Sequence, residues 1–165
     1  MAAQAAIPDP SRVAKLVLVV TKGHGMASSV AAFAARNGFD LTSATMEETI
    51  AFMTSALWSP NTPQDARDDI LALLPEDAWQ PTAEARAAIE ESLADFDPRP
   101  NLPSITAPTL VISGLSDGLN PPEPGREVAH LIPGARFEVY EHSGHMLASE
   151  ETDRLLTDVT ELIFS

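Results

Sequence analysis

The chain has 165 residues, and its 24 acidic against 10 basic side chains give a formal net charge of −14 at pH 7. This length predicts one compact domain, and the negative charge disfavours nucleic acid and anionic membrane surfaces as partners. The sequence has no cysteine, which excludes disulfides, thiol nucleophiles and thiolate metal sites. It also shows no apolar run near the roughly 20 residues of a membrane span and no secretory signal pattern, so a cytoplasmic location is expected.

The first predicted strand covers residues 15–20, which are apolar without alternation, a pattern typical of strands buried on both faces of a parallel sheet. Residues 26–104 then carry several helical patterns, separated by proline and polar breaks, and no convincing strand. A capping box at residues 45–48 predicts one helix start. Another is predicted with Thr62 as N-cap and Pro63 at the first helical position. This region is therefore expected to be a helical insertion.

A βαβ unit is predicted from three further segments. Residues 108–113 form a second unbroken apolar strand, and residues 122–132 form a crossover helix. Residues 136–141 alternate apolar and charged side chains, as an edge strand does. A final helix from Ser149 carries one apolar stripe that is expected to pack flat on the sheet. The stripe consists of Leu155, Leu156, Val159, Leu162 and Ile163.

Residues 114–118, with the sequence GLSDG, fit the G-x-S-x-G pattern of a strand-to-helix turn that exposes a nucleophilic serine, here Ser116. Such a turn requires a helix directly after the serine, because the helix N-terminus supports the oxyanion. Three prolines within residues 119–125 delay the helix by several residues. Ser116 is therefore expected to be incidental to catalysis.

Asp117 is the stronger candidate, because it follows the carboxyl end of a buried strand, where open α/β sheets place their sites. His145 follows the next strand. A carboxylate at Asp117 would accept a hydrogen bond from the His145 ring and fix its tautomer, which is an arrangement for acid–base chemistry. The alternatives are a turn aspartate that caps backbone N–H groups and an ordinary loop histidine.

The remaining histidines are weaker candidates. His142, at the end of a strand, and His130, on the crossover helix, are expected to face solvent. His24 either borders the site or is a loop residue, and the second interpretation is favoured.

Other side chains of the helical region have both a functional and a simpler interpretation. Aromatic and methionine residues there would line an acyl pocket or, as we favour, only pack in the core; they are Phe52, Met53, Trp58 and Trp79. Acidic residues clustered on one helix indicate a solvated face; they are Asp65, Asp68 and Asp69. No metal site and no cofactor is expected.

Two motifs together resemble the α/β-hydrolase family. The pattern I-x-x-P-T-L-V-I-x-G-x-x-D-x-x-x-P spans residues 105–121, and IPGARFEVYEHSGHM spans residues 132–146. In that family the aspartate of the first motif is the acid of a catalytic triad and the histidine of the second is its base. The resemblance therefore implies these catalytic roles for Asp117 and His145.

The resemblance also implies an α/β fold that is part of the α/β-hydrolase fold: a three-stranded parallel sheet flanked by helices, with a helical lid. Residues 1–25 and 105–165 would form the C-terminal part of the core, and residues 26–104 the lid. Met1 falls just after the place where the family carries G-x-S-x-G. The family's earlier strands and its HG oxyanion loop also belong before that place, so the resemblance implies that the serine nucleophile is missing from this chain.

The leading hypothesis is hydrolysis of a carboxylic ester or lactone, a small-molecule substrate, by a Ser-His-Asp triad in which Asp117 orients His145 as general base. The chain as given is then expected to be inactive. One alternative is an upstream aspartate nucleophile, as in dehalogenases and epoxide hydrolases, although Tyr140 is the only tyrosine and cannot form the paired lid tyrosines of the latter. Another is a non-catalytic remnant or binding module.

Overall fold

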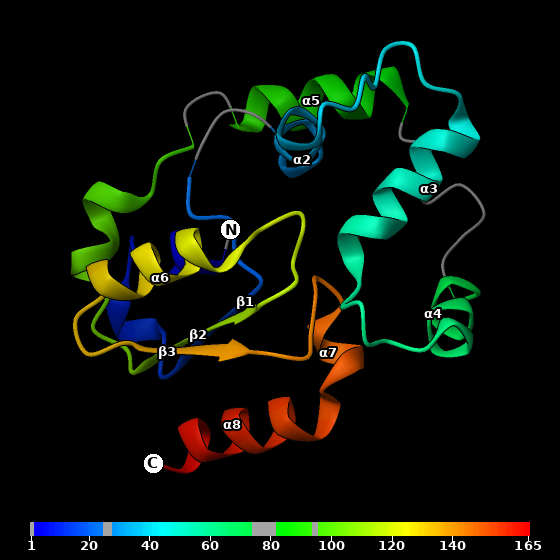
Figure 1. Cartoon of the computed structure of the whole chain (residues 1–165). Coiled ribbons are helices and arrows are strands. Elements are labelled where there is room, and N and C mark those ends of the chain that lie inside the picture. The colour runs from blue at the N-terminus through cyan, green and yellow to red at the C-terminus, as the bar shows by residue number, and fades with distance from the viewer. Residues whose placement is uncertain (1, 25–27, 74–81, 94–95) are drawn as a thin grey trace.

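A computed structural model describes residues 2–24, 28–73, 82–93 and 96–165 (Figure 1). Its sheet has three parallel strands in the order β1-β2-β3, formed by Leu16–Val19, Thr109–Gly114 and Arg136–Tyr140. All six residues of β2 are buried, and β3 lies at one edge of the sheet. The predicted strands, their parallel pairing and the edge position of β3 are therefore confirmed.

The strand β1 is less buried than its sequence predicts. Leu16 and Leu18 are buried, whereas Val17 and Val19 remain partly exposed. Among the described strands β1 pairs with β2 alone, so it too is an edge of this sheet. The expectation of burial on both faces is correct for β2 and wrong for β1.

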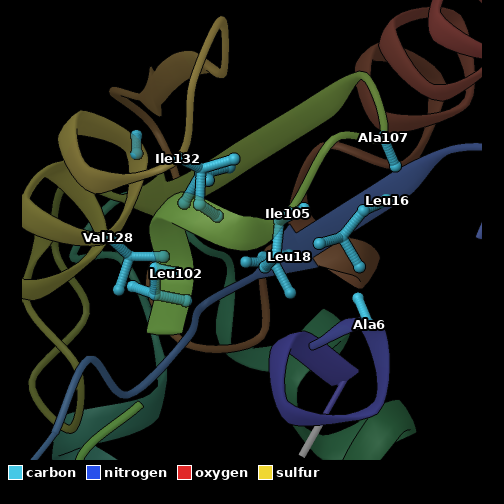
Figure 2. Packing of buried hydrophobic residues seen from close by; sticks show 10 residues of the cluster. Ala6, Leu16, Leu18, Leu102, Ile105, Ala107, Val128 and Ile132 are labelled. Carbon is cyan, nitrogen blue, oxygen red and sulfur yellow. The ribbon is translucent and has the colours of Figure 1, made fainter. Parts of the chain in front are cut away.

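Two layers of helix cover the sheet. The crossover helix α6, Pro122–Leu131, and the short α1, Ala2–Ala6, lie on one face, where their side chains join those of β1 and of the segment before β2 (Figure 2). The other face is covered by the two C-terminal helices, α7 (Leu147–Glu150) and α8 (Thr152–Phe164). Successive residues of β2 point to opposite faces, so Val111 belongs to the first core cluster and Leu110 to the second. The predicted crossover helix is confirmed.

The C-terminal helix differs from its prediction in two ways. It is divided into α7, Leu147–Glu150, and α8, Thr152–Phe164, because Glu151 has non-helical dihedral angles (φ −131°, ψ 51°). Of its apolar stripe, Leu162 is 5% exposed and buried against the sheet, but Leu156 and Ile163 are 60% and 53% exposed. The stripe is wider than the surface that α8 shares with the sheet, so the expectation that all of it packs flat is wrong.

Hydrogen bonding adds to the apolar contact between α8 and the sheet. The Tyr140 side chain is fully buried, and its hydroxyl donates to Asp158 Oδ2 on α8 at 2.6 Å. The pKa of Tyr140 is raised above its ordinary value, mainly by burial and to a smaller extent by this hydrogen bond. The guanidinium of Arg154 covers the ring, 4.0 Å from its centre. The end of β3 is thereby fixed to α8.

The described residues between β1 and β2 form helices joined by turns and irregular segments, with no strand among them. They contain α2 (Ser29–Asn37), α3 (Met46–Leu57), α4 (Gln64–Leu71), α5 (Ala83–Leu93) and the 3₁₀ helix η2 (Arg99–Ser104); a second 3₁₀ helix, η1 (Pro10–Arg12), precedes β1. Nowhere in the described ranges is a helix long and apolar enough to cross a membrane.

The two predicted helix starts in this segment have different outcomes. The capping box of Thr45 and Glu48 at the start of α3 is confirmed. The second start is wrong by one residue: α4 begins at Gln64, its N-cap is Pro63, and Thr62 does not cap it. The Thr62 hydroxyl instead donates to Glu150 Oε1, so a tertiary partner has replaced the local one.

Two leucines of α8 test the observed division of its stripe. Leu162→Ala should lower the free energy of unfolding by about 2 to 5 kcal/mol, because a buried side chain is lost and a cavity remains. Leu156→Ala, the matched control in the same helix, should change it by less than about 0.5 kcal/mol. Urea unfolding followed by circular dichroism measures both. Equal losses at the two positions would contradict the exposure of Leu156.

Candidate active site

The candidate site lies where β2 and β3 end. Asp117 follows β2 and His145 follows β3, and these parallel neighbours have their carboxyl ends at the same edge of the sheet. His145 Nδ1 lies 2.9 Å from Asp117 Oδ2. The hydrogen bond predicted from the sequence is therefore present, while the catalytic role of the pair stays a prediction.

Asp117 is held by the turn that it occupies. Its Oδ1 accepts hydrogen bonds from the backbone N–H groups of Leu119 and Asn120, at 2.9 and 2.8 Å. Its Oδ2 faces His145, and the side chain is 0% exposed. The turn-capping interpretation and the functional one are therefore compatible, because each uses a different oxygen of the same carboxylate.

The ring of His145 is oriented by this carboxylate and remains accessible, with 26% of the side chain exposed. A carboxylate partner assigns the hydrogen to Nδ1, since the carboxylate can only accept. No described residue forms a hydrogen bond with Nε2. In this tautomer Nε2 carries a lone pair and is available to take up a proton.

Ser116 does not lie at a strand-to-helix turn. The next helix, α6, begins only at Pro122. The Ser116 N–H donates to the Ser143 carbonyl at 3.0 Å, and within the described residues no hydrogen bond joins its hydroxyl to His145. These observations agree with the expectation that Ser116 is incidental.

Two glycines allow the loops of the site to pack backbone against backbone. A Cβ on Gly114 would collide with the carbonyl oxygen of Gly144. A Cβ on Gly144 would lie 2.5 Å from the Leu57 carbonyl oxygen and 2.9 Å from the Ser59 nitrogen. Gly114 of the GLSDG motif therefore serves the close approach of β2 to the histidine loop, which we define as residues 143–146.

The end of α3 contacts both loops of the site. The last carbonyl groups of a helix lack partners within it and need donors from elsewhere. Here the Ala56 carbonyl accepts from the Gly118 N–H at 3.0 Å, and the Leu57 carbonyl accepts from the Met146 N–H at 3.0 Å. One helix end thus binds the loop that carries Asp117 and the loop that carries His145.

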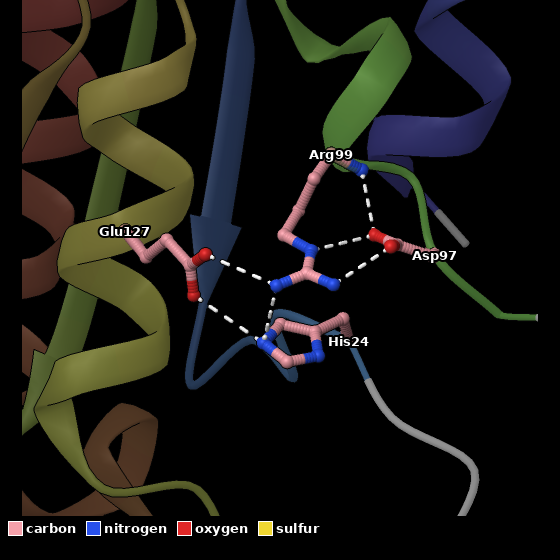
Figure 3. A network of polar contacts seen from close by, with 4 residues as sticks. All are labelled: His24, Asp97, Arg99 and Glu127. Carbon is pink, nitrogen blue, oxygen red and sulfur yellow. Dashed lines mark hydrogen bonds and ion pairs between the residues drawn. The ribbon is translucent and has the colours of Figure 1, made fainter.

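The other candidate histidines lie apart from this pair. His130 and His142 are exposed, as predicted. His24 belongs to a separate polar network (Figure 3), where its Nε2 lies 3.1 Å from Arg99 Nη1 and 3.4 Å from Glu127 Oε2. Arg99 also donates twice to Asp97, through Nε and Nη2, each at 2.7 Å. This network connects the segment after β1, the segment before β2 and α6, so the interpretation of His24 as a loop residue is the one that agrees with the structure.

The apolar candidates of the helical segment are buried or packed against a neighbouring ring. Met53 and Trp58 are buried, and the Phe52 ring stacks on Phe39 with centroids 3.9 Å apart. These contacts favour the core interpretation; Trp79 lies outside the described residues.

The three aspartates of α4 are exposed, as predicted: Asp65, Asp68 and Asp69. In the described part of the chain no group of three histidine or acidic side chains is placed to hold a metal ion.

Glu150 and Glu151 were not predicted to contribute to the site. Glu150 Oε2 accepts from the Gly144 N–H at 2.7 Å, and Glu151 Oε2 accepts from the Ser143 hydroxyl. Their position at a predicted helix start gave no indication that they would reach back to the histidine loop. The only feature of the sequence that pointed to Glu150 and Glu151 was that they follow His145 closely along the chain.

Comparison with known proteins gives a consistent result. A family model described as alpha/beta hydrolase fold matches residues 1–152. A protein of Stutzerimonas stutzeri named "Putative carbamate hydrolase RutD" is 34% identical over 111 residues, which are 65% of this chain and 40% of that protein. An enol-lactonase from Burkholderia xenovorans has a TM-score of 0.75 at 22% identity, over 99% of this chain and 61% of its own. An esterase from Exiguobacterium antarcticum has a TM-score of 0.69 at 20% identity, over 99% and 63%. The chain thus spans less than two thirds of the length of these relatives.

The network around Arg99 predicts a pH effect. The hydrogen bond from the Arg99 guanidinium lowers the pKa of Asp97 from 3.8 to about 2. A depressed carboxyl pKa means that the contact is stabilising above about pH 4 and is lost as the pH falls toward 2. In Arg99→Gln the pKa of Asp97 should return toward 3.8, as measured by carbon NMR titration of its carboxyl group.

His24→Gln is the matched control, since it leaves both Arg99 hydrogen bonds to Asp97 in place. An unchanged titration of Asp97 in Arg99→Gln would contradict the assignment, as would an equal change in both variants.

Proposed function

The chain belongs to the alpha/beta hydrolase fold family, and we propose that it supplies the acid and the base of a Ser-His-Asp triad that hydrolyses a carboxylic ester or lactone. The observation that carries this proposal is the 2.9 Å contact between His145 Nδ1 and the buried Asp117 carboxylate at the ends of two parallel strands. The names of relatives support the substrate class, because they include an esterase and an enol-lactonase.

In this mechanism His145 moves protons through Nε2. It takes the proton of the serine hydroxyl as the oxygen attacks the substrate carbonyl, and gives it to the leaving alcohol when the tetrahedral intermediate collapses. It then takes a proton from the water that attacks the acyl-enzyme, and returns this proton to the serine oxygen as the acid is released. Asp117 keeps the ring in the required tautomer and stabilises the imidazolium that forms at each step.

The proposal places the serine outside this chain. Ser116 lacks the helix that a nucleophile turn requires, because α6 begins only at Pro122. We also propose the following division: residues 1–25 and 105–165 belong to the core, and residues 26–104 form a lid. The hydrogen bonds from Gly118 and Met146 to the end of α3 support this assignment, since they attach the helical segment directly to both site loops.

The proposal also covers the substrate, the partners, the location and the cofactor requirement of the protein. The substrate is a small molecule, nucleic acid and anionic membranes are disfavoured by the net charge of −14, and the protein acts in the cytoplasm. The chemistry assigned to Asp117 and His145 requires no cofactor.

The 165-residue chain should show no turnover of p-nitrophenyl acetate that depends on His145. His145→Ala and Ser116→Ala should therefore both equal the unchanged chain in a spectrophotometric assay. A fluorophosphonate probe, which reacts with activated serines, should leave the chain unlabelled. Hydrolysis or labelling that both substitutions abolish would contradict the proposal and identify Ser116 as the nucleophile.

The coding DNA upstream of Met1 tests the proposed triad itself. It should encode an in-frame G-x-S-x-G directly before Met1. In the correspondingly longer protein, His145→Ala should lower kcat for the ester by about 10⁶. Upstream stop codons would indicate a non-catalytic product, and an aspartate in place of the serine would indicate chemistry of the dehalogenase type.

A further inference from the structure

The direction of the His145 ring depends on the backbone of the histidine loop, and that backbone is anchored next to the ring. The Gly144 N–H, one residue before His145, donates to Glu150 Oε2 at 2.7 Å. The Met146 N–H, one residue after it, donates to the Leu57 carbonyl at 3.0 Å. Displacing either anchor would move the Cα of His145 relative to Asp117.

Glu150 connects this loop to the segment after α3. Its Oε1 accepts from the backbone N–H of Ser59 at 2.8 Å and from the hydroxyl of Thr62. These partners lie about 90 positions earlier in the chain, at separations of 91 and 88 residues. A single carboxylate therefore links the histidine loop to residues 59–62.

The chemistry of these donors makes the carboxylate difficult to replace. A backbone N–H can only donate, so Gly144 and Ser59 both require an acceptor on Glu150. Glu151, the adjacent residue, accepts from the Ser143 hydroxyl, which can also rotate and accept. A glutamine at position 151 can thus still pair with the Ser143 hydroxyl. A glutamine at position 150 would instead place its NH₂ group, a donor, against the N–H of Gly144 or of Ser59, which is also a donor.

We propose that Glu150 is a positioning residue for the base: its carboxylate ties the Gly144 N–H to residues 59–62 and thereby keeps the His145 ring within hydrogen-bonding distance of Asp117. This inference rests on the proposed function, because a fixed His145 matters for catalysis only if it is the base. Glu150 acts through the backbone of the loop and does not touch the substrate.

The experiment follows the Nδ1 proton of His145 by ¹⁵N–¹H NMR in the 165-residue chain. The signal is assigned by its loss in His145→Gln, and Asp117→Ala, which removes the carboxylate, gives the reference for an unpaired ring. In Glu150→Gln the exchange of this proton with water should become about tenfold faster, since one charge-assisted hydrogen bond of the loop is lost. Glu151→Gln, the matched control, should stay within about twofold of the unchanged chain.

Backbone amide exchange in β2 separates local from global effects and should be the same in both glutamine variants. Should Glu150→Gln fail to fold, Thr62→Val removes a single donor to the carboxylate and should speed the exchange about threefold. Unchanged exchange in Glu150→Gln and Thr62→Val would overturn the inference, as would equal acceleration in Glu151→Gln. Absence of the Nδ1 signal from the unchanged chain would instead contradict the Asp117–His145 pair, and with it the proposed function.

Discussion

The complete burial of β2 is the constraint on which the rest of the structure depends. A strand buried at every position needs a hydrogen-bonding neighbour on each edge and apolar cover on each face. Here β1 and β3 provide the neighbours, while the layer of α6 and that of α7 and α8 provide the cover. Parallel pairing of β2 with β3 requires a crossover connection, which α6 forms. The crossover returns the chain to the same side of the sheet, so Asp117 and His145 meet because of the topology.

The site is then refined by contacts between backbones. Gly114 and Gly144 leave no room for a Cβ where β2 meets the histidine loop and where that loop meets the end of α3. Close packing of main chains brings N–H groups and carbonyls into direct contact, and they must be paired. The carbonyls at the end of α3 and the carboxylate of Glu150 supply the acceptors. The position of His145 is therefore determined mainly by main-chain hydrogen bonds.

The parts of the fold that depend on local pattern could be predicted from the sequence. Apolar runs identified the strands, and the position of Asp117 and His145 after neighbouring strands predicted their hydrogen bond. The parts that failed depend on partners far away in the chain. Thr62 has the local features of an N-cap, but its hydroxyl binds Glu150, 88 residues later. The exposure of Leu156 likewise depends on how much of α8 the sheet covers, which periodicity does not reveal.

The hydrogen bonds of the site loops also bear on whether these loops could supply an oxyanion hole. An oxyanion hole requires backbone N–H groups that are directed at the substrate and free to bind it. The Gly118 and Met146 N–H groups are engaged by α3, the Gly144 N–H by Glu150, and the Ser116 N–H by the Ser143 carbonyl. The N–H groups of Leu119 and Asn120 are engaged by Asp117.

These six donors hold the loops of Asp117 and His145 in place and are therefore occupied. A triad completed around His145 would draw one oxyanion donor from the element that carries its nucleophile, because the N–H after the nucleophile contributes to the oxyanion hole in this kind of site. The occupied donors, like the missing helix after Ser116, thus support the proposal that the attacking oxygen and its oxyanion partners belong to another segment.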